Sequence, residues 1–500
     1  KAAAKGAAKA KAKAAAKGAA DAEKVTSPER PAAGAARPSP NVAETTPEKT
    51  VAPGSQGAEK ARQAGQAPRE PSRFDRFSSN AWKEYNSLYA ARLDRLRGPV
   101  MEQARSLWGG MLDPGAFKKE ISGYRQGSQG AEVVLVGILF RNLKGRANVF
   151  EQYQSQKIGV LPSDVCDGSH ASKLCTDDDE MWLEDRTMRV QLQMAPELRA
   201  RVATGMVLAV RGTANDDFNQ PTKDGNFSAS ALCFARMPSP VALPAPESES
   251  APGHYLALVS GLTATPVGGV SEDLAAARAK CAEYLRSGAV HHVVICGGTL
   301  WGVGKDNAKA ALEEADALLS SLAEKVPVIV LPGRGDPTSM SLPQMPLHPH
   351  LFRRVHSHKA NFRAVSNPYS GSLGGTKLLG HSGQPIEDLM RCSSIATPLE
   401  ALMTTLEALH LAPTAPDTLA AQPFEEADPF VIDEVPHVLF AGGCDRAAHG
   451  WQPASRGDGG TICVCVPAFH KHPAAVLVNL HNPQDVRVLE FGASGDVCMG

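Results

Sequence analysis

The first 70 residues contain no aromatic residue and no leucine, isoleucine, methionine or cysteine. Their only large apolar residues are Val25, Val42 and Val51. Such a segment cannot bury enough apolar surface to offset the loss of chain entropy on folding, so we expect residues 1–70 to be disordered. Thirteen of these residues are basic and 7 are acidic. This Ala/Lys-rich tail could contact nucleic acid or carry a nuclear import signal, or it could be a solvated low-complexity extension.

Paired cysteine motifs and long apolar runs are also missing. None of the 10 cysteines forms a CxxC pair, and no Cys/His spacing is typical of a zinc site. No apolar run reaches the roughly 18 residues that a membrane-spanning helix needs. The sequence therefore predicts a soluble intracellular protein from a reducing compartment, with no metal or other cofactor.

The residues after the tail have the spacing of a helix. From Trp82 to Leu96, apolar residues recur at intervals of three and four, which predicts a helix within residues 74–108 that Pro99 ends or kinks. We assign residues 74–125 to an N-terminal helical region. Its apolar stripe is expected to pack on its own domain rather than on a partner.

Short β-rich runs separated by turn residues occupy residues 131–240. Gly137 lies inside the first run, where a barrel strand would bend or bulge. These strands predict a small antiparallel barrel of the OB-fold type. OB-folds often bind single-stranded nucleic acid. Here aromatic residues are few and the acidic run 177–180 would repel phosphate, so a structural or protein-binding barrel is favoured. The runs are residues 131–143, 182–194, 204–214 and 226–237.

An α/β pattern follows the barrel. Residues 241–253 are rich in proline, serine and glutamate, which predicts an extended linker. In residues 254–500 strands and helices alternate, which predicts a layered α/β domain with mixed strand directions. The organising strand is expected at residues 326–331, an apolar run that ends at Pro332. The predicted fold class is thus α/β plus β, with a disordered tail.

Four of these strands end in loops of small residues. Ligands bind at such strand ends in open α/β sheets, so an active site would lie here. The layout resembles that of calcineurin-like metallophosphoesterases, whose D-x-H, G-D-x-x-D, G-N-H-[D/E] and G-H-x-H motifs hold two metal ions that activate water. The corresponding loop residues in this chain are Ser260, Leu262, Gly297, Gly298, Trp301, Gly333, Arg334, Gly335, Asp336, Gly443 and Asp445.

The metal ligands of that family are missing from these loops. Gly298 stands where a carboxylate belongs, Arg334 replaces an asparagine, and Gly443 replaces a histidine. Asp336 and Asp445 cannot form a dinuclear site alone, because hard cations need several converging ligands. We therefore expect vestigial loops with no catalytic residue, in which Asp336 caps backbone N–H groups of its turn. A rebuilt metal centre, the alternative, would draw on the remaining histidines: His348, His350, His356, His358 and His381.

Several phrases resemble the small, or B, subunit of replicative DNA polymerase delta. The resemblance runs from about Phe74 to Val488 and includes the GILF and LEDRTMRVQL phrases of the predicted barrel. The corresponding small subunits of polymerases alpha and epsilon share the architecture but match these phrases less closely. The phrases are LPQMPLHPHLF (342–352), SNPYS (366–370), LLGHSGQPIEDLMR (378–391), LAPTAPDTLAAQPFEEADPFVI (411–432) and PHVLFAGG (436–443).

This resemblance implies a noncatalytic accessory subunit in the nucleus, with an OB-fold and an inactivated phosphoesterase domain. It implies that the subunit holds the C-terminal cysteine-rich metal module of the catalytic subunit. It also implies a bridge to a third subunit, which connects to the sliding clamp, while DNA is contacted weakly or indirectly. Three alternatives stay open: the small subunit of another replicative polymerase, a phosphodiesterase or nuclease with a rebuilt metal site, and a single-strand binder that acts alone.

Overall fold

The computed structural model describes most of the chain beyond the N-terminal tail. The expected disordered tail (1–70) and Trp301 lie outside the described residues, as does most of the predicted linker. No helix within the described part of the chain is long and apolar enough to cross a membrane. The described residues are 74, 84–125, 130–146, 173–215, 225–243, 253–265, 269–300, 307–455, 459–492 and 497–499.

Helix α2 (Asn86–Trp108) carries the predicted apolar stripe, but it continues through Pro99. Of the two alternatives predicted for Pro99, an end or a kink, the end was wrong. Proline removes one backbone N–H donor, and burial of Leu96 and Val100 on either side holds the helix against the core in spite of that loss. Two short 3₁₀ turns, η2 (Pro114–Ala116) and η3 (Ile121–Arg125), follow the helix.

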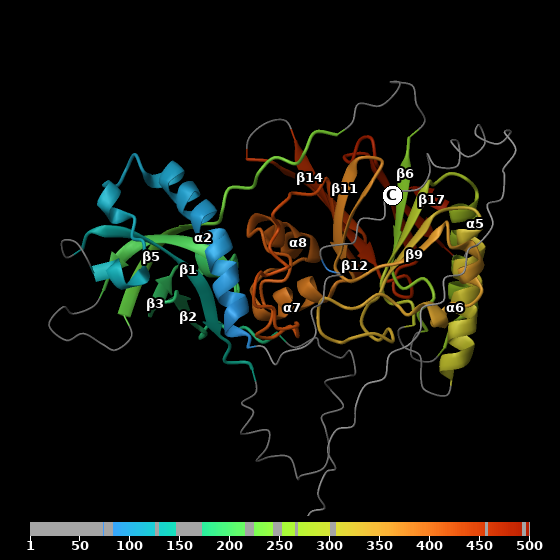
Figure 1. Cartoon of the computed structure of the whole chain (residues 1–500), viewed down its shortest axis with the longest axis horizontal. Helices are drawn as coiled ribbons and strands as arrows, with labels where there is room; N and C mark the ends of the chain where they lie inside the picture. The colour runs from blue at the N-terminus through green and yellow to red at the C-terminus, as the bar shows by residue number, and fades with distance from the viewer. Residues whose placement is uncertain are drawn as a thin grey trace, which may run out of the picture. The chain divides into compact units, whose positions relative to one another are not determined.

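Five strands close into a barrel in the order β1-β2-β3-β5-β4 (Figure 1). Neighbours pair antiparallel except β3 and β5, which are parallel, so the barrel is not wholly antiparallel as predicted. β1 passes from β4 to β2 at Gly137, where a Cβ would lie 2.6 Å from the carbonyl oxygen of Glu184. The barrel elements are β1 (Glu132–Asn142), β2 (Glu180–Glu184), β3 (Arg189–Met194), the short helix α4 (Pro196–Ala200), β4 (Val207–Ala214) and β5 (Gly225–Cys233).

Two details of the barrel differ from the sequence-based prediction. The run predicted at 182–194 is a hairpin, because Asp185 accepts hydrogen bonds from the N–H groups of Thr187 and Met188 and so forms a turn between β2 and β3. The acidic side chains of residues 177–180 are not all exposed at the surface, as the prediction of phosphate repulsion assumed. Asp179 is buried and pairs with Arg141 at 2.7 Å, so it stabilises the barrel instead of facing solvent.

The α/β region contains two stacked sheets rather than one. The seven-stranded sheet has the order β17-β16-β15-β6-β7-β8-β9, and the five-stranded sheet has the order β10-β11-β12-β14-β13. β6 to β9 are parallel neighbours, whereas β15, β16 and β17 are antiparallel additions. The sheets share one apolar core, in which Leu258 and Val294 from the first meet Phe440 and Val464 from the second.

Helices cover the outer faces of both sheets (Figure 1). α5 (Glu272–Arg286) and α6 (Ala308–Ala323) pack on the seven-stranded sheet, and α7 (Gln384–Cys392) and α8 (Pro398–Glu407) pack on the five-stranded one. The strands are β6 (Tyr255–Val259), β7 (His292–Cys296), β8 (Val328–Leu331), β9 (Phe362–Ala364), β10 (Tyr369–Leu373), β11 (Thr376–His381), β12 (Val438–Cys444), β13 (Ala448–Pro453), β14 (Gly460–Pro467), β15 (Ala474–Asn479), β16 (Val486–Phe491) and β17 (Val497–Met499).

A buried arginine ties α2 to the barrel and to the α/β region. Arg92 is fully buried and its Nε donates to Asp428 Oδ2 at 2.7 Å. Its other nitrogens donate to the carbonyl oxygens of Gly205, Pro413 and Ala415 at 3.0, 2.9 and 2.7 Å. Since these acceptors come from a barrel loop and from the PTAPDTL phrase (residues 413–419), one side chain fixes three separate segments together.

Candidate functional site

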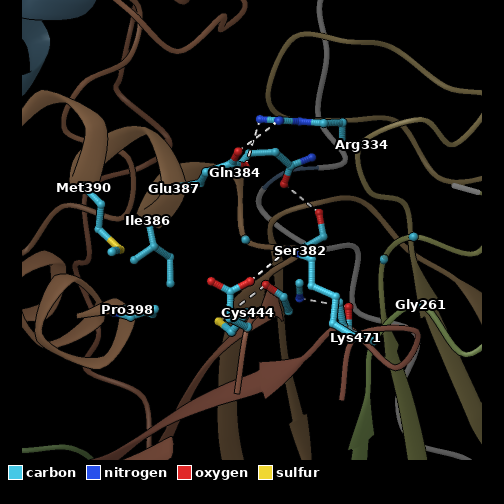
Figure 2. A pocket seen from close by; sticks show the side chains of 18 of the residues that line it. Gly261, Arg334, Ser382, Gln384, Ile386, Glu387, Met390, Pro398, Cys444 and Lys471 are labelled. Atoms are coloured by element: carbon cyan, nitrogen blue, oxygen red, sulfur yellow. Dashed lines mark hydrogen bonds and ion pairs between the residues drawn. The ribbon is translucent and has the colours of Figure 1, made fainter. Parts of the chain in front are cut away.

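The C-terminal ends of β6, β7, β8 and β12 meet around one cavity of about 530 Å³ (Figure 2). Six of the predicted loop residues line it. Leu262 and Asp336 are buried nearby without lining it, and Gly333 and Gly335 do not line it either. The structure therefore brings the predicted loops together at one rim. The six lining residues are Ser260, Gly297, Gly298, Arg334, Gly443 and Asp445.

Glycine is required in these loops because their backbones approach one another closely. A Cβ on Gly297, whose φ is +82°, would lie 2.3 Å from Ser382 Cβ. A Cβ on Gly333 would lie 2.6 Å from the nitrogen of Gly298. Real Cβ atoms do not come so near to other heavy atoms, so a side chain at either position would force the loops apart.

Asp336 holds two of the loops together through its carboxylate. Oδ2 accepts hydrogen bonds from the N–H groups of Gly298, Thr299 and Gly333 at 3.1, 3.2 and 2.7 Å, and Oδ1 accepts one from Leu300 at 2.6 Å. Burial raises the pKa of Asp336 to about 6, although these four donors act to lower it. The side chain caps backbone N–H groups, as the sequence predicts, and it does so for the β7 loop as well as for its own turn.

A network of buried side-chain amides supports the loops that contain Gly333 and Ser382. Asn367 Nδ2 lies 2.7 Å from Gln344 Oε1 and 2.7 Å from Ser382 Oγ, and Gln384 Nε2 donates to Gln344 Oε1 at 3.0 Å. Gln344 in turn donates to the carbonyl oxygen of Gly333 at 3.3 Å. Sequence reasoning missed this network. Its one signal is that all three amides adjoin a proline, in the phrases LPQMP, SNPYS and HSGQP.

Two ion pairs lie at the edge of the cavity. Arg334 pairs with Glu387 of α7 at 3.0 Å, and Lys471 pairs with Asp445 at 2.8 Å. All four side chains are more than one-third exposed, so water screens each pair strongly. Neither Glu387 nor Lys471 was expected from the sequence. Both aspartates of the predicted loops are thus already engaged, Asp336 by backbone donors and Asp445 by a lysine.

Three of the histidines named for a rebuilt metal centre have other contacts in the structure. His381 is fully buried, burial lowers its pKa to about 3, and its Nδ1 accepts a hydrogen bond from the N–H of Gly383 at 3.1 Å. His348 and His350 stack on each other with ring centroids 5.0 Å apart. Within the described ranges, no group of three or more His, Cys, Asp or Glu side chains could hold a metal ion.

Known proteins identify the family. A family model for the OB-fold domain of the DNA polymerase delta subunit matches residues 84–220, and a family model for the B subunit of DNA polymerases alpha and epsilon matches residues 257–449. DNA polymerase delta subunit 2 of Drosophila melanogaster is 30% identical over 437 residues, which cover 83% of this chain and 94% of that protein. The chain belongs to the family of DNA polymerase delta small subunits.

Other members of this family match over a similar length. The DNA polymerase delta small subunit of Arabidopsis thaliana is 29% identical over 80% of this chain and 89% of that protein. The corresponding subunit of Saccharomyces cerevisiae is 26% identical over 79% of this chain and 87% of that protein. These small subunits are accessory subunits of a polymerase that acts in DNA replication. The resemblance and the OB-fold predicted from the sequence are both confirmed.

Proposed function

We propose that this delta small subunit is a noncatalytic scaffold in which the 254–500 region is a calcineurin-like phosphoesterase domain with a vestigial active site. The proposal rests on which residues stand at the strand ends around the cavity and on what they bind. Gly298, Arg334 and Gly443 stand where the resemblance to metallophosphoesterases expects metal ligands, and the Asp336 carboxylate already accepts hydrogen bonds from four backbone N–H groups. A dinuclear centre needs several oxygen or imidazole ligands directed at each ion.

The partners we propose are the C-terminal cysteine-rich metal module of the catalytic subunit and a third accessory subunit, which reaches the sliding clamp. A scaffold must keep its docking surfaces in a fixed relation. The four bonds of buried Arg92 support this role, because they fix α2, the barrel and the PTAPDTL phrase to one another. DNA would be contacted weakly or indirectly, and the place of action would be the nucleus.

We further propose a division of the chain into five parts. Residues 1–70 would be a disordered tail, 74–125 a helical region, 131–240 the OB-fold, 241–253 a linker and 254–500 the phosphoesterase-like domain. Two observations support the last three boundaries. The five barrel strands fall between residues 132 and 233, and the first strand of the two stacked sheets begins at Tyr255.

Co-purification tests the assembly. The full chain, tagged and expressed in its native cells, should bring down the polymerase delta catalytic subunit and a third subunit in stoichiometric amounts. A variant of Arg92 is not a suitable negative control here because it would unfold the chain locally, so an untagged strain serves instead. Purification without any large polymerase subunit would refute the proposed role.

A phosphodiesterase assay tests the absence of catalysis. With Mn²⁺, the purified chain should turn over neither bis-p-nitrophenyl phosphate nor single-stranded DNA. Turnover that is abolished by Asp336→Ala or Asp445→Ala would establish a rebuilt metal site and contradict the noncatalytic role. Strong DNA binding by the chain alone, falling steeply with salt, would instead favour a single-strand binder.

A further inference from the structure

The cavity at the vestigial rim has the size of a small-molecule site. Its volume of about 530 Å³ lies within the roughly 300–1,000 Å³ of typical ligand pockets. Segments from distant parts of the sequence enclose it, including Lys173 from the barrel region, the first turn of α7 and the loop after β14. Because glycines form much of its floor, a ligand could approach the backbone closely.

One wall of this cavity is apolar. Figure 2 shows Ile386, Met390 and Pro398 gathered on one side, with Lys471 on the other. Ile395 continues the apolar wall. Methionine is polarisable and makes favourable contacts with aromatic rings. A flat, weakly polar body fits this wall better than a strongly hydrated one.

The charges around the cavity favour an anion. Four basic side chains line it against two acidic ones; Arg391 also pairs at 3.5 Å with Asp388, which does not line the cavity, so a surplus of one positive charge remains. Burial and the nearby cations Lys471 and Arg278 lower the pKa of His470, so that side chain adds no charge at neutral pH. The four bases are Lys173, Arg334, Arg391 and Lys471, and the two acids are Glu387 and Asp445.

Arg334 and Lys471 can leave their present ion pairs for a bound anion at little cost in free energy. The pairs Arg334–Glu387 and Lys471–Asp445 are exposed, and such pairs contribute about 1 kcal/mol or less. Arg391 Nε is buried and lacks a hydrogen-bond partner among the described residues. The N-terminal turn of α7 also lines the cavity, and a helix N-terminus favours negative charge.

We propose that this cavity binds a phosphomonoester dianion carried on a flat ring system, with a nucleoside monophosphate as the matching ligand class. The phosphate lies among Lys173, Arg391 and Lys471, and the base lies against Ile386 and Met390. The charge of a phosphomonoester, about −1.5 to −2 at neutral pH, is opposite in sign to the net charge of the side chains around the cavity. The site goes beyond the scaffold role: it binds without cleaving, because the rim provides no metal centre.

The test is calorimetric titration of the full chain, in its co-purified complex, with dAMP, deoxyadenosine, inorganic phosphate and phosphoserine. We expect dAMP to bind at least about tenfold more tightly than deoxyadenosine, inorganic phosphate or phosphoserine, since only dAMP has both a phosphate and a base. The affinity for dTMP should be within about threefold of that for dAMP, because the apolar wall offers no hydrogen bonds that would distinguish one base from another. Binding of phosphoserine as tight as that of dAMP would overturn the nucleotide assignment.

Two lysine variants locate the site. Lys173→Gln and Lys471→Gln should each weaken dAMP binding by about tenfold, as expected for loss of one charge contact. Lys309→Gln is the matched control, because Lys309 is an exposed lysine on α6 that does not line the cavity. Equal affinity in all three variants would refute the site. Binding followed by hydrolysis would leave the site standing and would refute the noncatalytic role separately.

Discussion

Replacing Arg92 by methionine tests whether one buried side chain couples the barrel to the α/β region. The guanidinium makes four hydrogen bonds, one to Asp428 and three to carbonyl oxygens of Gly205, Pro413 and Ala415. Methionine fills a similar part of the space but donates nothing. The variant therefore removes the interactions while it limits the cavity that would otherwise complicate the result.

The expected loss of unfolding free energy comes from the buried Asp428 carboxylate that the substitution leaves without its arginine. Asp428 has no solvent-exposed side-chain surface and would lose its counter-ion, although His410 Nε2 at 2.9 Å and the N–H of Phe430 at 2.9 Å would remain. Breaking a buried pair in this way costs about 3–5 kcal/mol. Arg92→Met should lower the free energy of unfolding by that amount, and Arg92→Met/Asp428→Asn should recover part of it because no uncompensated charge remains.

The neighbouring Arg95 provides a matched control on the same helix. Arg95 pairs with Asp433 at 2.6 Å, but the two side chains are 64% and 46% exposed. Arg95→Met should therefore cost less than about 1 kcal/mol. Urea denaturation gives the free energies, and hydrogen exchange over residues 411–432 reports the local loss of protection. If Arg92→Met and Arg95→Met cost the same, Arg92 does not couple these segments.

The cost of Arg92→Met should also depend on pH. Burial acts to raise the pKa of Asp428, but the charge of Arg92 and the contact with His410 hold it well below its usual range. The pair therefore contributes stability that is present above the unfolded pKa of roughly 3.9 and is lost as pH falls. In the variant burial dominates and the pKa rises. Protonation then relieves the buried charge, so the difference from the native chain should be smaller at acidic than at neutral pH.

Three further outcomes follow from single positions. Asp336→Ala leaves four backbone N–H groups without an acceptor and should lower the free energy of unfolding by at least about 3 kcal/mol in urea denaturation. Gly380→Ala would place a Cβ 2.4 Å from the ring of Phe440 and should cost about 1–3 kcal/mol, whereas Gly110→Ala, with open space around it, should be close to neutral. Burial, together with the nearby side chains of His254 and His291, lowers the pKa of His292 to about 4. The neutral form of His292 therefore contributes stability that is present above roughly pH 6.5 and is lost toward pH 4. His292→Gln should flatten the fall in unfolding free energy over this window.

Local patterns predicted the elements of the fold but not how they are joined. The stripe of α2 and the apolar run of β8 follow from spacing and burial, because each side chain need only find a hydrophobic neighbour. The division into two sheets does not follow from spacing. β15 pairs with β6 across more than 200 residues, and no periodicity specifies which distant strand completes a sheet edge. Pro99 shows the same limit, since tertiary packing outweighed a local helix breaker.

The sequence predicted the role of a site residue only where that role depends on neighbouring residues of the same loop. Asp336 lies in a glycine-rich turn, so a capping role follows from the sequence, and the proposed loss of metal ligands was likewise read from the loop residues alone. The amides of Gln344, Asn367 and Gln384 meet from segments 17 to 40 residues apart. Lys471 is an exposed lysine that looks like any other until the fold brings it to Asp445. Polar contacts between distant segments leave almost no pattern in the chain.

If the rim is the vestigial metal site proposed above, its backbone also explains why a single substitution would not restore a metal centre. At the two glycines that the resemblance places at ligand positions, Gly298 and Gly443, φ is +73° and +69°, a left-handed backbone in which a side chain would be strained. Freeing Asp336 to bind an ion would strip four N–H groups of their acceptor. Under the proposed assignment, the hydrogen bonds and the left-handed glycines of these loops oppose the return of metal ligands, because a new ligand would first strain the loop that must carry it.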